Sequence, residues 1–318
     1  SRERLPDFFS LGHPKCGTTA LDEMLRQHPR IYMPELKEPW FFASDLRPRF
    51  QPARAGATPG TLSDYLSLFA GARPEQRAGE ASSFYLSSQT AAEGIARMCP
   101  DARLIAILRE PASFLRSLHL QLLRDHIESE RDLGRALALE PARTGGREIP
   151  RRSHLPQLLL YSRHVRYVEQ LRRYGELFAR ERLLVLIYDD FLDDNEGTLG
   201  AVLRFLELEG HVAVRPTTAN ATVRRMRSQR LDELLGAVSV GRGPISLTAK
   251  RAIKTLTPAA ARSAALKGTR RHLVYGRPDP PDERLMLELR GRFRDEVVAL
   301  SEYLERDLVA LWGYDSLD

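Results

Sequence analysis

A short loop near the start of the chain combines residue types that can hold an anion. It reads Gly12-His13-Pro14-Lys15-Cys16-Gly17-Thr18-Thr19. An apolar run at 8–11 precedes the loop and a helical pattern follows it, so backbone N–H groups and the positive end of a helix dipole would converge there. The loop is therefore interpreted as an oxyanion site, and a tight strand-to-helix turn with incidental polarity is the plainer alternative.

The glycine spacing is that of a phosphate-binding P-loop, but the lysine of that motif is displaced. Thr18 follows the second glycine, and the lysine stands at position 15 instead. An ATPase or GTPase needs a lysine on the β- and γ-phosphates of its nucleotide, so triphosphate hydrolysis is disfavoured. A P-loop-type kinase with a displaced lysine stays an alternative function.

A second cluster follows the apolar run at 104–108. Arg109 stands at the end of this run, Pro111 comes two residues later, and Ser117 lies eight residues after the arginine. A guanidinium can fork onto phosphate oxygens, and a hydroxyl can donate one further hydrogen bond. Taken alone, Arg109 has a plainer alternative, a surface charge that flanks a helix.

The two clusters together resemble the sulfotransferases that use 3′-phosphoadenosine 5′-phosphosulfate (PAPS). PKCGTT at 14–19 is similar to the 5′-phosphosulfate loop of that family, and the segment 109–117 is similar to its 3′-phosphate motif. LVLIYDDF at 184–191 and YGR at 275–277 extend the similarity toward the C-terminus. The chain is thus identified as a member of the PAPS-dependent sulfotransferase family, of the bacterial type and similar to the heparan branch.

The resemblance implies in-line transfer of a sulfonate group without a metal. PAPS would be the donor and 3′,5′-adenosine bisphosphate the product. Lys15 would neutralise charge on the departing phosphate, and Arg109 and Ser117 would hold the 3′-phosphate. Tyr188 would contact the adenine, with a buried core tyrosine as the alternative. The remaining implied cofactor-binding residues are Cys16, Gly17, Thr18, Thr19, Gly276 and Arg277.

An acceptor hydroxyl needs a general base within hydrogen-bond reach. Glu38 lies in KEPWFF at 37–42, which is similar to the segment that carries the glutamate base in bacterial and heparan-type enzymes. His119, two residues beyond Ser117, is the second candidate. A solvated loop carboxylate and a structural histidine are the respective alternatives.

The acceptor is expected to be a small molecule, a lipid or a glycoside. Ala81 stands where the resemblance places a lysine that contacts sulfated sugar, so a heparan substrate is disfavoured. The eight histidines and two cysteines show no metal-ligand spacing, and no metal site is predicted. The sequence leaves the oligomeric state open.

Three short apolar runs, at 8–11, 104–108 and 183–188, are typical of strands that are covered on both faces. Each precedes a helical pattern, at 18–27, 112–124 and 195–206. This alternation predicts an α/β fold with a central parallel sheet flanked by helices. The expected organisation is one P-loop-like domain over 1–318, with helical and loop insertions over the acceptor side and a last helix over about 282–311.

Two segments have unusual composition. Residues 140–153 are rich in glycine, proline and arginine, which predicts a mobile surface loop. Residues 234–278 contain no acidic residue and many basic ones, and are expected to form a basic helical insertion. This insertion is expected to make weak contact with an anionic membrane. An anionic-surface binding protein is accordingly a further alternative function, while nucleic acid is not an expected partner.

Composition and charge set the outer limits. The 318 residues are 42% hydrophobic and 28% charged, with a net charge of +6, so a disordered chain is excluded and an anionic ligand is favoured. No apolar run approaches the roughly 20 residues that span a bilayer. Two cysteines suit a reducing compartment, and a cytoplasmic location is expected.

Overall fold

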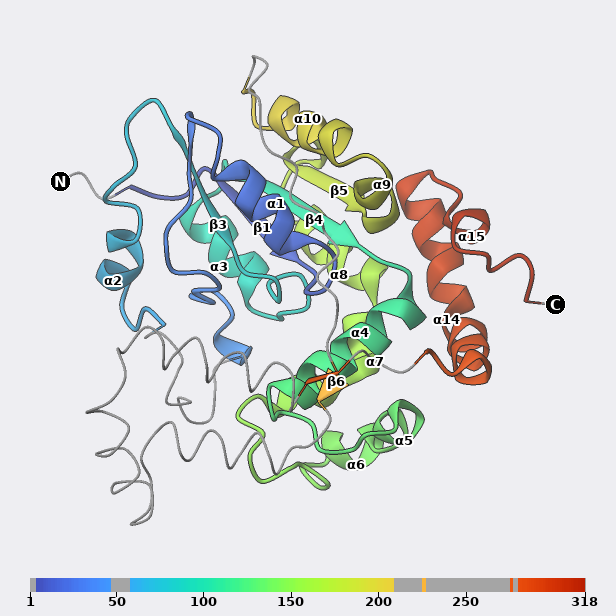
Figure 1. Ribbon diagram of the computed structural model, residues 1–318. Coiled ribbons are helices and arrows are strands. Elements are labelled where there is room, and N and C mark those ends of the chain that lie inside the picture. Colours follow the sequence, from blue (N-terminus) through green and yellow to red (C-terminus); the bar gives the residue numbers. More distant parts are fainter. Residues whose placement is uncertain (1–3, 47–57, 209–224, 227–274, 277–279, 318) are drawn as a thin grey trace, which may run out of the picture.

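The short apolar runs become strands of one parallel sheet. The computed structural model describes residues 4–46, 58–208, 225–226, 275–276 and 280–317 (Figure 1). Within these residues the sheet has the strand order β2-β3-β1-β4-β5, with every neighbouring pair parallel. The strands are β1 Phe8–Gly12, β2 Ile31–Tyr32, β3 Arg77–Ala81, β4 Arg103–Leu108 and β5 Leu183–Ile187. The predicted α/β class with a central parallel sheet is confirmed.

Helices connect the strands and flank the sheet. Helix α1 packs with α10, while α14 packs with both α4 and α8 (Figure 1). The described helices are α1 Thr18–Leu25, α2 Leu62–Ser67, α3 Ala91–Met98, α4 Pro111–Arg124, α5 Leu133–Ala138, α6 Glu140–Thr144, α7 Tyr161–His164, α8 Tyr167–Gly175, α9 Tyr188–Asp193, α10 Asn195–Phe205, α14 Glu283–Leu304 and α15 Leu308–Leu311. The last long helix thus lies against the helix that follows β4.

The end of β1 lies unusually close to the chain that follows β3. Gly12 has a φ of +106°, and a Cβ built there would lie 1.7 Å from the carbonyl oxygen of Ser83. Only glycine tolerates both this backbone conformation and this contact. The carboxyl ends of β1 and β3 can therefore approach each other directly.

Two predicted boundaries differ from the structure. The strand expected to run through Tyr188 ends at Ile187, and Tyr188 begins α9. The single last helix expected over 282–311 is interrupted at Glu305, which has a left-handed φ of 53°. The Asp307 side chain then accepts a hydrogen bond from the N–H of Ala310 and starts α15. A local capping carboxylate therefore overrides the continuous apolar periodicity.

Two further short strands form a separate antiparallel pair. They are β6 Arg225–Met226 and β7 Tyr275–Gly276, and β6 lies against α4. Apart from the backbone of β7, the predicted basic insertion 234–278 lies outside the described residues.

The prediction of a mobile loop over 140–153 is wrong for its first part. Residues 140–144 form α6, and the side chain of Arg143, on this helix, is buried. The Arg143 guanidinium donates two hydrogen bonds, of 2.7 and 2.9 Å, to the carboxylate of Glu128, and Tyr161 donates a third of 3.0 Å. Glycine and arginine content indicated a solvated loop, but one arginine finds a fully buried partner 15 residues earlier in the chain.

The Arg143–Glu128 pair yields a stability prediction. Burial alone would raise the pKa of Glu128, but hydrogen bonds from Arg143 and from the Glu130 N–H hold this pKa below its usual value. Arg143→Met leaves the carboxylate buried without its cation, and we expect the free energy of unfolding in urea to fall by about 3–5 kcal/mol.

The matched control is the double variant Arg143→Met with Glu128→Gln, which removes both charges. It should recover a large part of the loss, because no buried charge then lacks a partner. An Arg143→Met chain as stable as the parent would show that the pair does not hold α6 in place.

Candidate active site

The predicted anion loop lies at the carboxyl end of β1 and leads into α1. Gly17, at the N-cap of α1, has a φ of +83°, and a Cβ there would lie 2.8 Å from the ring of Phe191. The first turn of α1 therefore directs its unpaired N–H groups at the loop. Lys15 also has a left-handed φ, of 64°. Burial, followed by the nearby cations Arg124 and Arg109, lowers the pKa of Lys15.

Arg109 joins the two predicted phosphate-binding motifs. One terminal nitrogen donates to the carbonyl oxygen of Lys15 at 3.0 Å, and Nε and the other terminal nitrogen donate to Ser113 Oγ at 3.0 and 2.6 Å. The guanidinium also lies 4.8 Å from the centre of the Tyr188 ring. The anion loop, the end of β4 and the start of α9 thus meet at one arginine.

Ser117 lies two turns along α4, on the side of the helix that is buried in the protein. Its side chain is buried, yet Oγ has no hydrogen-bond partner among the described residues. A buried hydroxyl without a partner costs free energy, so such a group calls for a specific explanation. β6 lies against the same helix and pairs with β7, which contains Gly276, whereas Arg277 lies outside the described residues.

Glu38 is held at the same edge of the sheet. Its Oε2 accepts hydrogen bonds from the Ser83 N–H at 2.7 Å and from the Trp40 indole N–H at 2.8 Å. Because Ser83 contacts Gly12, this carboxylate stands beside the beginning of the anion loop. Burial raises the pKa of Glu38, although the two donors oppose the shift. A half-buried carboxyl with a raised pKa suits a general base.

His119 lies elsewhere, inside the polar cluster around Glu128. Its Nδ1 is 2.9 Å from the Tyr161 hydroxyl and its Nε2 is 3.2 Å from the carbonyl oxygen of Arg131. The ring is buried, and burial lowers its pKa. Both ring nitrogens are therefore engaged within the protein.

Comparison with known proteins identifies the family. The sequence profile of the sulfotransferase family matches residues 6–92 and 65–211, which include the loop, the Arg109 segment and the start of α9. The chain belongs to the sulfotransferase family.

Individual relatives agree with this assignment. A sulfotransferase structure from Alicyclobacillus acidocaldarius is 29% identical, with a TM-score of 0.59 over 81% of this chain and 99% of the other. Human carbohydrate sulfotransferase 15 is 32% identical over 36% of this chain and 27% of its own length. The membrane-associated sulfotransferase kil1 of Dictyostelium discoideum is 29% identical over 34% of this chain and 21% of its length. The chain thus spans only about a quarter of the length of these two curated relatives.

His13 is a site feature that the sequence did not single out. It is fully buried, with Nε2 2.8 Å from Gln170 Oε1, and its ring packs against Phe114 and Tyr167. Burial, and to a lesser extent His164, lowers the pKa of His13 to about 3. Tyr167 in turn donates to the carbonyl oxygen of Arg109 at 2.8 Å. The sequence shows only that a histidine stands in the loop. Its burial could not be predicted, because the residues that cover it come from helices distant in sequence.

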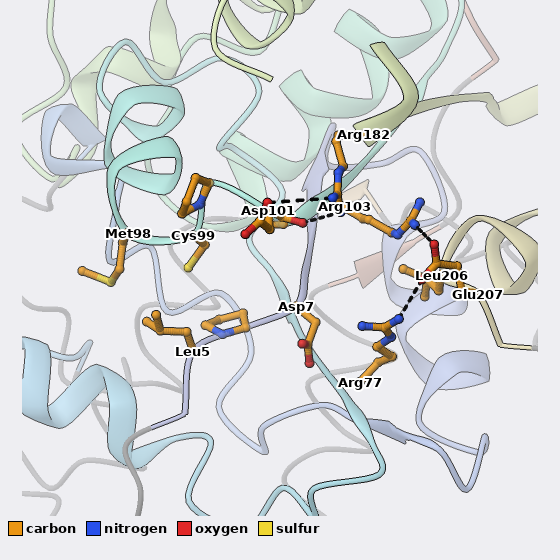
Figure 2. A pocket seen from close by; sticks show the side chains of 13 residues that line it. Leu5, Asp7, Arg77, Met98, Cys99, Asp101, Arg103, Arg182, Leu206 and Glu207 are labelled. Atoms are coloured by element: carbon orange, nitrogen blue, oxygen red, sulfur yellow. Dashed lines mark hydrogen bonds and ion pairs between the residues drawn. The ribbon is translucent and has the colours of Figure 1, made fainter. Parts of the chain in front are cut away.

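A cavity of about 300 Å³ lies at the other edge of the sheet, where the strands begin. Figure 2 shows most of its charged side chains paired with one another: Arg77 and Arg103 on Glu207, and Arg182 with Asp101. Most of its lining residues precede or begin β1, β3, β4 and β5, and Leu206 and Glu207 follow α10, whereas the candidate site residues follow strands. This cavity is therefore separate from the candidate site.

In the part of the chain that the structure describes, no helix is both long and apolar enough to cross a membrane. Within the same residues, no group of three or more His, Cys, Asp or Glu side chains could hold a metal ion.

The environment of Cys16 predicts an unreactive thiol. Cys16 is fully buried inside the loop, and burial raises its pKa to about 12; burial also raises the pKa of Cys99 to about 12. Since the thiolate is the reactive form, we expect iodoacetamide at pH 8 to label neither cysteine in the native chain and both in urea, as measured by intact mass. Rapid labelling of native Cys16 would show instead that the loop opens or that the thiol is activated.

Proposed function

We propose that this sulfotransferase uses PAPS as its donor and transfers the sulfonate group to an acceptor hydroxyl. The observation that carries the proposal is the contact of Arg109 with the Lys15 carbonyl, because it joins the loop for one phosphate to a helix that offers a buried hydroxyl for a second. Nucleotides with phosphates on both the 3′ and 5′ positions need such a divided site. We also infer that residues 1–318 form one domain, a proposal that the packing of α14 on α4 and α8 supports.

The residues present fit this donor. The loop from Lys15 to Thr19 offers N–H groups and one ammonium for a 5′-phosphosulfate. Arg109 and Ser117 would hold the 3′-phosphate, and Tyr188, buried beneath the guanidinium, offers a ring face for the adenine. When bound, PAPS supplies an activated sulfonate with a nucleoside bisphosphate as its leaving group.

Transfer at sulfur then depends mainly on position and charge. Lys15 would neutralise the negative charge that grows on the bridging oxygen as the bond from that oxygen to sulfur breaks. Glu38 would accept the proton of the acceptor hydroxyl while its oxygen forms the new bond to sulfur. Lys15 follows β1 and Glu38 follows β2, with β3 between the two strands, so the two groups can act on opposite sides of the sulfonate.

For the acceptor we propose a hydroxyl on a small molecule, a lipid or a glycoside. The similarity to a carbohydrate sulfotransferase supports a sugar-bearing acceptor. The direct test is incubation with labelled PAPS and a panel of such acceptors, with detection of the added sulfonate by mass. Phosphate transfer from ATP with magnesium, and none from PAPS, would contradict the proposal and favour a kinase.

Substitutions in the donor site should separate binding from chemistry. We expect Arg109→Ala to weaken binding of 3′,5′-adenosine bisphosphate about 10- to 100-fold by calorimetry, because hydrogen bonds to charged groups are lost. Lys15→Ala should lower kcat/KM by about 100-fold or more. The remote, exposed Arg73→Ala serves as the control and should change neither value. Unaltered kcat/KM in both site variants would contradict the assigned roles.

The two base candidates can be separated in the same way. Glu38→Gln should lower kcat by about 100- to 10,000-fold and leave binding of the bisphosphate within twofold, since only proton transfer is removed. His119→Gln is the comparison, and we expect its kcat per folded molecule to stay close to that of the parent. A large loss of kcat in His119→Gln, with Glu38→Gln active, would reverse the assignment.

Because a base must be ionised to act, the raised pKa of Glu38 also has a pH consequence. The rate should fall as the pH drops through this raised value, so the acid limb of kcat/KM lies above that of an exposed glutamate.

A further inference from the structure

Asp22 on α1 is a buried carboxylate with no part in the chemistry above. Its side chain is 4% exposed, and Oδ1 has no hydrogen-bond partner among the described residues. Oδ2 accepts from Arg26 Nε at 2.8 Å and lies 3.1 Å from Lys37 Nζ. Since burying a carboxylate costs free energy, its two cations need to be held firmly in place.

Through these cations Asp22 reaches the segment that leads to Glu38. The two terminal nitrogens of Arg26 donate to the carbonyl oxygens of Met33 and Pro34, at 3.0 and 2.6 Å. Lys37, the other cation on Asp22, immediately precedes Glu38. Three attachments within five residues thus tie the approach to Glu38 onto α1.

The far side of the same segment is tied to the end of β3. The Glu38 N–H donates to the Ala81 carbonyl oxygen at 3.2 Å, and the Trp40 N–H donates to Ser82 Oγ at 3.2 Å. Glu38 and Trp40 both have left-handed φ values, of 55° and 50°. A backbone in this conformation persists only where its surroundings hold it, and Asp22 supplies the half of that support that comes from α1.

Helix α1 begins in the donor loop, so any residue that fastens the Glu38 segment to α1 also fixes the base relative to the donor. We propose that Asp22 is a positioning residue that sets Glu38 against the donor loop by anchoring Arg26 and Lys37. This inference rests on the proposed function of Glu38.

The charged groups around Glu38 also affect its pKa, which can be measured from the pH dependence of the rate. Asp22 from α1 acts on Glu38 as an anion, and Lys37 and Arg26 are the cations that Asp22 holds. Glu80 from β3 is the other nearby carboxyl; burial, and to a smaller extent the charge of Glu38, raises its pKa to about 7.

Burial is the main cause of the raised pKa of Glu38, and the hydrogen bonds from Trp40 and Ser83 oppose it. The negative charge of Asp22 raises this pKa further. Loss of this negative charge should therefore lower that pKa.

The test is Asp22→Asn, which keeps the shape of the side chain and removes its charge. We expect kcat to fall about 10-fold or more, binding of 3′,5′-adenosine bisphosphate to stay within twofold, and the acid limb of kcat/KM to move to lower pH. Hydrogen exchange of residues 33–42 should become faster in the unliganded protein. This last readout does not depend on activity.

A matched control is Glu207→Gln, since Glu207 also bridges two arginines, but at the opposite edge of the sheet. It should leave kcat, the pH profile and exchange at 33–42 unchanged. Lys37→Met, at a half-exposed position, is the second variant if Asp22→Asn does not fold. It removes one attachment, and we expect a several-fold lower kcat with unaltered binding of the bisphosphate.

Either of two results would overturn the inference: unchanged kcat with a lower melting temperature alone, or loss of bisphosphate binding in parallel with kcat. The first would make Asp22 merely structural, and the second would place its effect on the donor loop. Failure of the proposed function would give another result: the parent chain itself would transfer no sulfonate. Hydrogen exchange of residues 33–42 would still show whether Asp22 holds this segment on α1.

Discussion

The hydrogen bond from Arg109 to the carbonyl oxygen of Lys15 is the contact on which the donor site depends. It fixes a side chain from the end of β4 on the backbone of the loop that follows β1. The same guanidinium holds Ser113 and lies over Tyr188. Since a planar guanidinium donates in fixed directions, one residue can set the relative positions of three chain segments.

The parallel sheet makes this arrangement possible. Its strands present their carboxyl ends at one edge, and the strand order puts β1 between β3 and β4. The loop after β1 therefore meets Arg109, the proposed donor-binding arginine, at the end of β4 on one side. On its other side the chain after β3 holds Glu38, the proposed base, which itself follows β2. The close approach of Gly12 to Ser83 brings the second of these near, because Ser83 donates to Glu38.

Local patterns made the α/β class predictable. Short apolar runs indicated β1, β4 and β5, and the loop and Arg109 follow two of them directly in sequence, whereas the two-residue β2 and the RAGEA sequence of β3 carry no such run. Glu38 came from its resemblance to a family segment, and its role remains a proposal, as do the roles of the loop, Arg109, Ser117 and Tyr188. The local sequence pattern did not indicate the buried polar contacts, because their partners are distant in sequence. Glu128 draws Arg143 into the core, Tyr161 engages His119, and Lys37 and Arg26 meet on Asp22.

The proposed donor site recognises a nucleotide by two separate phosphates. Calorimetric titration of the parent chain with 3′,5′-adenosine bisphosphate and with 5′-AMP, without magnesium, tests this claim directly. The proposed roles of Arg109 and Ser117 predict that the bisphosphate binds about 100-fold more tightly than 5′-AMP, because only the bisphosphate offers a 3′-phosphate for charge-assisted hydrogen bonds. Equal affinity for the two nucleotides would contradict the claim.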